Sequence, residues 1–285
     1  MFLKLISIHD FNVKESWLKA VNKVKNLSAF EKYVHIFWFS GPFILLIERD
    51  PADLWLTLIS IVFLIRCYLK KEWSWSKQTW FKLAIAFWIT SLISASLSPD
   101  PIYSLSQGIP WIRFPLYAAA AQAWLGKDRD IRLLMFISII FGLLIMNGIL
   151  LAEVIIDPKL RLTWPYGDMV PGVYIAKLGL PIICTLLVFN LRKVNIFVSI
   201  FIIFSIVMTF LTGERTHFLL LICSCFLSSF FWKPKFFIYL ISALTVLGVL
   251  FSVSLLRPDT TNRLISHTSK IFMYLFNHED INYFV

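Results

Sequence analysis

Five polar residues, Gly213 to His217, separate two long apolar runs in the segment LTGERTHFLLL, residues 211–221. Arg215 keeps its charge and presents a planar fork of donors that suits phosphate oxygens. Glu214 beside it can orient the arginine or accept a proton, and His217 can titrate near neutral pH. These residue types predict a turn that binds an anion. The alternative is an interfacial turn in which Arg215 reaches into water and Glu214 is solvated.

A second group of candidate residues lies in the segment RLTWPYGD, residues 161–168. The proline and glycine in this run predict an ordered turn rather than a helix. Arg161 adds a second cation. The rings of Trp164 and Tyr166 can stack on a sugar, or they can lie in the aromatic belt at a membrane surface. Asp168 belongs either to the site or to the N-terminus of the helix that follows, where a negative charge is favourable.

Arg113 is the third candidate, and it stands between two prolines in the segment IPWIRFPL. The apolar runs around it place it at or inside a membrane boundary, where a charge is costly unless it is paired or lines a wet cavity. Ser104, Ser106 and Gln107 come shortly before it and can line such a cavity. The alternative is an arginine whose long side chain reaches the interface.

The composition predicts a membrane protein. Of the 285 residues, 58% are hydrophobic and 15% are charged, and the mean hydropathy is +0.75. Soluble proteins carry about 25% charged residues. The four cysteines and five histidines show no metal-site spacing, so we expect no metal and no cofactor. Phosphate-binding glycine loops, zinc-protease motifs and nucleophile elbows are not found in the sequence. The predicted fold class is all-α, a polytopic transmembrane helix bundle.

We predict about nine spans from the apolar runs. They cover residues 33–48, 53–69, 80–97, 110–125, 132–152, 170–189, 194–212, 217–232 and 236–255. The fourth contains two prolines, so we expect its outer end to be bent or re-entrant. Residues 1–32 are expected to form an amphipathic cytoplasmic segment on an anionic membrane face. Residues 33–255 then form the bundle, and residues 256–285 begin a periplasmic loop.

The distribution of charge predicts that the N-terminus is cytoplasmic and the C-terminus periplasmic. In this orientation the inner segments hold 18 of the 27 lysines and arginines and the outer segments hold 8, while the acids divide as 6 inside and 11 outside. Excess basic residues in cytoplasmic loops are the usual pattern of such proteins. The net charge of +10 is therefore explained by basic cytoplasmic segments, and we expect no nucleic-acid partner. Arg113, Arg161 and Arg215 are among the basic residues at the outer face.

Two segments resemble motifs of the O-antigen ligase-like membrane proteins. In RLTWPYGDMVPGVYIAKLGLPI, residues 161–182, the matching positions are Arg161, Leu162, Pro165, Gly167, Asp168, Gly172 and Tyr174. In LTGERTHFLLL they are Thr212, Gly213, Arg215, Thr216 and Phe218. Tyr166 replaces the family's usual phenylalanine, and Val173 stands where a small polar residue is common. The motifs occur in the family's order, each opens a span from the outer face, and the resemblance covers roughly the third to ninth spans.

The resemblance implies a metal-independent glycosyltransferase of the bacterial inner membrane, acting at the periplasmic face in lipopolysaccharide biosynthesis. Its donor is an undecaprenyl-pyrophosphate-linked glycan, which ligases transfer to lipid A–core and polymerases transfer to a second lipid-linked repeat. Arginines held at the membrane surface stabilise the charge of the pyrophosphate leaving group. We therefore predict catalytic roles for Arg215 and Arg161. The predicted substrate-binding residues are Arg113, Tyr166, Asp168, Glu214 and His217.

The family's general base is a histidine in the large periplasmic loop after the ninth span. Such a loop would continue past residue 285, so we expect this chain to be the N-terminal part of a longer protein. Two other classes of function remain open. A transporter or lipid flippase predicts inverted repeats and broken helices at the bilayer midplane, whereas no repeat is visible and the arginines gather at one face. The other class is a non-catalytic membrane scaffold.

Overall fold

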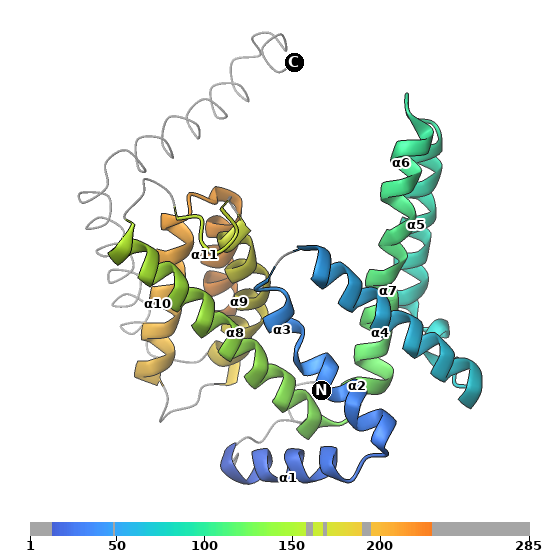
Figure 1. The fold of residues 1–285 in the computed structure, drawn as a ribbon, viewed down its shortest axis with the longest axis horizontal. Helices are drawn as coiled ribbons and strands as arrows, with labels where there is room; N and C mark the ends of the chain where they lie inside the picture. The colour runs from blue at the N-terminus through green and yellow to red at the C-terminus, as the bar shows by residue number, and fades with distance from the viewer. Residues whose placement is uncertain (1–12, 48, 158–161, 168–169, 190–194, 230–285) are drawn as a thin grey trace. The chain divides into compact units, whose positions relative to one another are not determined.

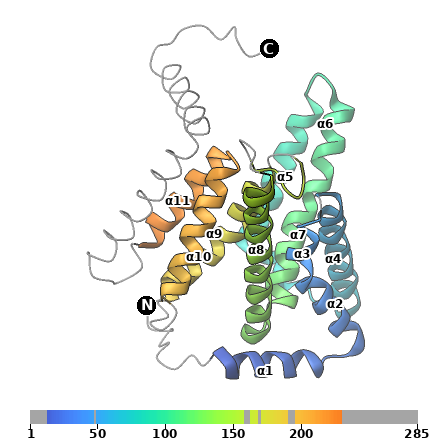
Figure 2. The same ribbon diagram turned by 60° about the vertical axis from the view of Figure 1, so that its left-hand side comes forward.

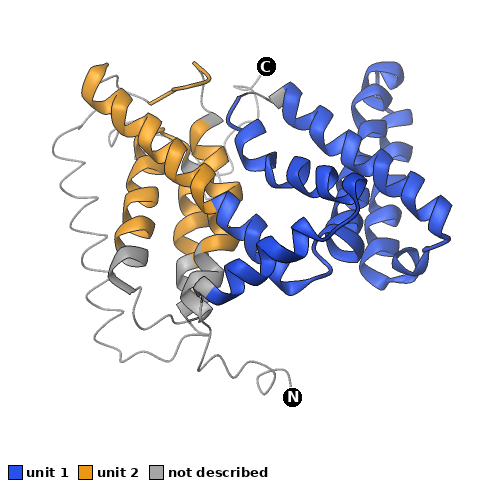
Figure 3. Cartoon of the chain, turned by 60° about the horizontal axis from the view of Figure 1, so that its bottom comes forward, with its two compact units in different colours: residues 1–139 blue, residues 140–285 orange. Residues whose placement is uncertain are grey.

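The computed structural model describes residues 13–47, 49–157, 162–167, 170–189 and 195–229 (Figure 1). Every regular element in these ranges is a helix, which confirms the all-α prediction for this part of the chain. The chain divides into two compact units, residues 1–139 and residues 140–285 (Figure 3). Each unit is described by itself below.

Unit 1 consists of helices that are short except for α4 and α5. In chain order they are α1 (Val13–Lys25), α2 (Ala29–Phe39), α3 (Gly41–Ile44), α4 (Arg49–Lys70), α5 (Thr79–Ser96), α6 (Pro101–Gly108) and α7 (Arg113–Ala120). Two 3-10 turns, Ser74–Lys77 and Ile109–Ile112, and one π turn, Ala121–Leu125, connect or extend them. Helix α8 (Arg129–Ile156) begins in unit 1 and continues into unit 2.

Aromatic side chains dominate the core of unit 1. Trp38, Trp55, Phe63, Trp75 and Trp124 are all at most 7% exposed. Buried indole N–H groups need acceptors. Trp38 donates to the Tyr117 hydroxyl at 3.0 Å, and Trp55 donates to the Phe37 carbonyl at 2.8 Å. These bonds connect α2 to α7 and to α4, so the rings both fill the core and set the helix contacts.

Two predicted spans in unit 1 differ from the observed helices. The helix predicted over residues 33–48 is divided at Ser40. A separate helix, α3, begins there at Gly41, with Pro42 in its first turn, and Gly41 lies directly against the Trp55 ring. The stretch between the third and fourth predicted spans contains a further helix. Helix α6 starts at Pro101 and packs along α5, where Trp88 donates to the Gly108 carbonyl at 3.1 Å (Figures 1 and 2). The prolines predicted to bend the fourth span fall at the 3-10 turn and in the first turn of α7.

Unit 2 contains the rest of α8 together with α9 (Val170–Phe189), α10 (Asn195–Leu211) and α11 (Arg215–Ser229). Helix α9 packs against both α10 and α11, and α10 packs against α11 (Figures 1 and 2). Asn147 of α8 donates to the Ser205 hydroxyl of α10 at 3.1 Å, and both residues are buried. A hydrogen bond of this kind is a common link between helices in an apolar environment.

Three described helices are long and apolar enough to cross a membrane: Asp50–Lys70, Thr79–Ser96 and Arg129–Ile156. They coincide with the second, third and fifth predicted spans. A shorter apolar helix, Ile200–Leu211, lies within the predicted seventh span. The total of nine spans and the orientation of the termini stay predictions, and the predicted span over residues 236–255 lies outside the described residues.

Candidate functional site

A buried carboxylate holds the turn over residues 162–167, which belongs to the motif RLTWPYGD. Glu153, in the last turns of α8, is 0% exposed. Both of its oxygens lie 3.0 Å from the backbone N–H of Thr163, and one accepts from the Trp164 N–H at 2.9 Å. The Thr163 hydroxyl adds a bond of 3.2 Å. A buried carboxylate is tolerated when donors surround it in this way, and all of these donors belong to the motif turn.

Beyond this anchor the chain forms the ordered turn that proline and glycine predicted. The N–H groups of Tyr166 and Gly167 both donate to the Thr163 carbonyl, at 3.0 and 2.9 Å. Gly167 has a φ of +73°, a conformation that side chains rarely adopt. The Trp164–Pro165 peptide bond is cis. Partial burial raises the pKa of Tyr166 to about 12, so its phenol is neutral at physiological pH and can donate a hydrogen bond.

The motif LTGERTHFLLL, residues 211–221, meets the RLTWPYGD turn at the end of α10. The Leu162 N–H donates to the Leu211 carbonyl at 3.2 Å, and both side chains are buried. Gly213, with a φ of +75°, ends α10 and reverses the chain. The Glu214 carbonyl then accepts from the Phe218 N–H at 2.9 Å, which starts α11. The two motif segments, about 50 residues apart in the sequence, therefore lie side by side in unit 2.

Gly172, in the first turn of α9, belongs to the same motif as Leu162 and makes a second contact between the two motif segments. A Cβ atom at this position would overlap the Thr212 hydroxyl oxygen and would lie 2.8 Å from the Glu214 Cβ. Thr212 is itself fully buried and donates to the Thr209 carbonyl at 2.7 Å, so it has little room to move. Only glycine permits this approach of α9 to the turn between α10 and α11.

The charged residues of the motif LTGERTHFLLL lie at the N-terminus of α11. Arg215 is the first residue of this helix. His217 Nδ1 lies 3.5 Å from a carboxylate oxygen of Glu214, with the two side chains 22% and 17% exposed. This Nδ1 is buried and makes no hydrogen bond. A protonated His217 would form an ion pair with Glu214 here. The helix N-terminus also favours an anion close to Arg215, because its first N–H groups have no partners within the helix.

Two predicted site residues, Arg161 and Asp168, lie outside the described residues. They flank the described turn in the sequence. A third, Arg113, belongs to unit 1, where its Nη2 is 2.7 Å from a carboxylate oxygen of Asp53 and its guanidinium lies over the Phe114 ring at 5.3 Å. The pairing explains how its charge is tolerated beside apolar helices. A role in substrate binding stays a prediction for Arg113.

Glu153 is the main residue of this site that the motifs did not reveal. Its only signal in the sequence is a carboxylate inside the apolar run ILLAEVII. Such a residue is expensive to bury unless it has partners, but nothing in the run shows that the partners are backbone groups ten residues later. Among the described residues, no three His, Cys, Asp or Glu side chains gather in a way that could hold a metal ion.

Comparison with known protein families, curated proteins and solved structures finds no match. The likeness to O-antigen ligase-like proteins therefore depends on the residues of the two motif segments.

Proposed function

We propose that this chain binds the pyrophosphate end of a polyprenyl-linked glycan and takes part in transferring that glycan to an acceptor. The reaction would occur at the periplasmic face of a bacterial inner membrane, as in the O-antigen ligase-like proteins. The observation that carries the proposal is the meeting of the two motif segments in unit 2. The Leu162–Leu211 hydrogen bond and the contact of Gly172 with Thr212 and Glu214 join the two stretches that resemble the family.

Arg215 would act on the leaving group. When the bond between sugar and phosphate breaks, negative charge develops on the pyrophosphate, and a cation fixed nearby lowers the energy of that transition state. Arg215 begins α11, so the dipole and free N–H groups of the helix act on the same anion. Arg161 is the second cation of the proposal. Glu214, His217, Tyr166 and Asp168 would bind the substrate around them.

The acceptor hydroxyl has to lose a proton to a general base, and we assign that role to no residue of the described segments. The acceptor would be lipid A–core in a ligase or a second lipid-linked repeat in a polymerase. Product analysis separates these two activities, because only a ligase places the glycan on lipid A–core.

The test replaces Arg215 by alanine and by lysine in the full chain. Inner-membrane vesicles containing each variant are supplied with the lipid-linked donor and with both acceptors, and glycan transfer is measured against protein abundance. We expect Arg215→Ala to lower transfer by about 100-fold or more, and Arg215→Lys to retain part of the activity. Arg132→Ala, at an exposed position early in α8, is the matched control and should be unaffected. Full transfer by Arg215→Ala at normal abundance would contradict the proposal.

A further inference from the structure

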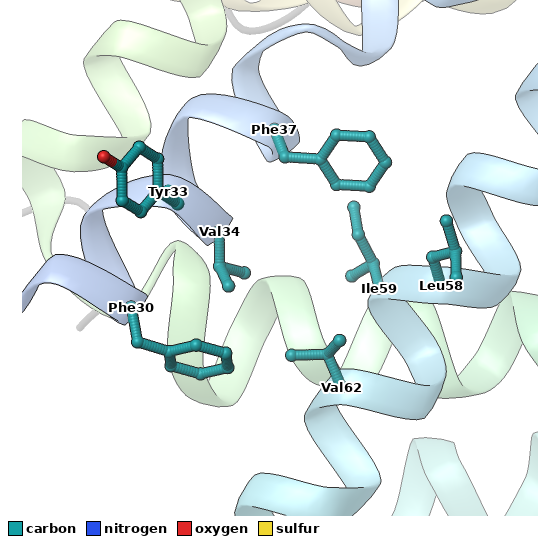
Figure 4. Close-up of a pocket in the computed structure, with 7 residues that line it drawn as sticks. All are labelled: Phe30, Tyr33, Val34, Phe37, Leu58, Ile59 and Val62. Carbon is teal, nitrogen blue, oxygen red and sulfur yellow. The ribbon is translucent and has the colours of Figure 1, made fainter.

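Unit 1 contains an apolar groove between α2 and α4, with a volume of about 220 Å³ (Figure 4). Helix α2 contributes Phe30, Tyr33, Val34 and Phe37. Helix α4 contributes Leu58, Ile59 and Val62. Both sets follow helical spacing, so each helix turns one continuous stripe of apolar side chains towards the groove.

The lining of the groove suits a hydrocarbon chain. Six of its seven side chains carry no polar atom, and Figure 4 shows the hydroxyl of Tyr33 directed away from the other six. Phe30 and Tyr33 are 59% and 71% exposed, so the groove opens to the surface of unit 1 between aromatic rings. An apolar groove of this kind offers dispersion contacts without any hydrogen-bonding demand.

One end of the groove is charged. Arg66 and Lys70 follow Val62 on α4 at intervals of four residues, and Glu31 follows Phe30 on α2. Lys70 Nζ is 3.2 Å from a Glu31 oxygen, and Arg66 Nε is 4.0 Å from the same oxygen. The Phe30–Val62 end of the groove therefore leads to two cations that share one carboxylate of α2.

Of these two cations, Lys70 retains capacity for a further anion. Arg66 is fixed by its ion pair with Glu72 at 2.6 Å and by stacking over the Trp124 ring at 5.0 Å. Its Nε is buried and makes no hydrogen bond, so Arg66 adds positive charge to this end of the groove without offering that atom to a ligand. The Lys70 side chain is 50% exposed and can turn from Glu31 to a second anion.

We propose that this groove binds one acyl chain of an anionic glycerophospholipid whose phosphate lies against Lys70, close to the charge of Arg66. The apolar lining takes the chain, and the charged end takes the phosphate. A zwitterionic phosphatidylcholine can supply the same acyl chain, but its positively charged choline offsets the negative charge of its phosphate, which Lys70 and Arg66 would attract. The site is consequently selective for the headgroup, and its selectivity depends on Lys70 more than on the apolar residues.

The experiment uses the full chain in detergent micelles and two photoreactive probes, phosphatidylglycerol and phosphatidylcholine, each with a diazirine near the end of an acyl chain. Cross-linked residues are mapped by mass spectrometry over a range of lipid concentrations. We expect phosphatidylglycerol to label the Phe37–Leu58 end of the groove at lower concentration than phosphatidylcholine. Lys70→Gln should raise the half-saturating concentration of phosphatidylglycerol about fivefold and leave phosphatidylcholine unchanged.

Two matched controls separate charge from shape. Lys77→Gln removes an exposed lysine outside the groove and should not alter labelling. Val62→Phe fills the groove and should reduce labelling by both lipids, whereas Ile65→Phe enlarges an exposed side chain of the same helix elsewhere and should not. Equal labelling by the two lipids, or an unchanged response in Lys70→Gln, overturns the proposal. Absence of label from the groove, expected if another part of the chain covers it, overturns it as well.

Discussion

Glu153 shows how one side chain can determine the shape of a motif that lies outside its own helix. Its carboxylate is fully buried and accepts every one of its described hydrogen bonds from Thr163 and Trp164. These bonds therefore hold the turn over residues 162–167 against the end of α8. We regard Glu153 as a positioning residue for the turn, since it holds backbone groups of the motif and not its predicted site residues.

Replacing Glu153 by glutamine should weaken this anchor. Glutamine has the same shape, but its NH₂ group is a donor that would face the backbone N–H groups of Thr163 and Trp164. An unsatisfied buried donor costs about 1–3 kcal/mol. We expect a lower unfolding temperature in detergent and faster trypsin cleavage after Lys159 and Arg161, two sites next to the turn in the sequence.

Glu15→Gln is the control for this variant, because Glu15 is 60% exposed and pairs with Lys19 on its own helix. It should leave both measurements unchanged. Unaltered cleavage and an unaltered melting temperature in Glu153→Gln would show that the turn keeps its shape without the carboxylate. Both readouts are independent of glycan transfer, so they test the positioning role even if the proposed function is wrong.

At the scale of elements, the site depends on how closely α9 approaches the turn between α10 and α11. The contact is made at Gly172, where the neighbouring Thr212 is buried and hydrogen-bonded. In a tightly packed interior, a larger side chain at Gly172 would displace α9 or Thr212, and neither can shift without disturbing the packing of its own segment.

Gly172→Ala should therefore destabilise unit 2. The added methyl group overlaps the Thr212 hydroxyl, and overpacking of this kind costs about 1–3 kcal/mol. Gly148→Ala in α8 is the matched control, because a Cβ there meets no atom within 4 Å and alanine favours the helix. Thermal unfolding of both variants in detergent checks the prediction. It fails if the two variants melt at the same temperature.

Helix α1 is attached to unit 1 by charge as well as by apolar contacts. Ala20 and Val24 are buried, and Lys23 Nζ lies 2.8 Å from Asp128 and 2.6 Å from Asp130. The hydrogen bond to Asp128, followed by the one to Asp130, raises the pKa of Lys23, so its charge is secure at physiological pH. The described part of the predicted amphipathic segment, α1, is thus anchored to its neighbours in unit 1. Its predicted contact with an anionic membrane stays a prediction.

Lys23→Gln should loosen α1 without unfolding the rest of unit 1. Hydrogen exchange measured by mass spectrometry should become faster over residues 13–25. Lys19→Gln is the control, since the ion pair of Lys19, at 2.6 Å, is with Glu15 on the same helix. Equal exchange in α1 of the two variants would argue that Ala20 and Val24 hold the helix unaided.

At the scale of the whole molecule, the distribution of lysine and arginine predicts a cytoplasmic N-terminus. Single cysteines at residues 77 and 102, in a chain whose native cysteines are replaced, test this orientation in intact cells. A membrane-impermeant maleimide should label Ile102→Cys, which lies at an 84% exposed position early in α6. It should not label Lys77→Cys until the cells are opened. The reverse pattern would show that the orientation is wrong.

Much of this protein follows from local sequence. Apolar runs near 20 residues predict helices that fit a bilayer, and three described helices coincide with predicted spans, because helix formation depends on neighbours a few residues apart. The turn at Trp164–Gly167 was visible from its proline and glycine for the same reason. The hydropathy of these stretches did not predict the division of residues 33–48 or the helix that starts at Pro101. Average hydropathy over a run of residues does not show where a helix ends inside that run.

The sequence alone determined the helical character of the described chain and the local chemistry of its two motifs. Only the tertiary structure decided which groups meet. Glu153 bonds to Thr163, Gly172 makes room for Thr212, and Arg113 pairs with Asp53, although 10, 40 and 60 residues separate the partners. Such contacts depend on how helices pack rather than on any local pattern. A buried carboxylate or a close glycine acquires its role from partners that its own neighbourhood in the sequence does not reveal.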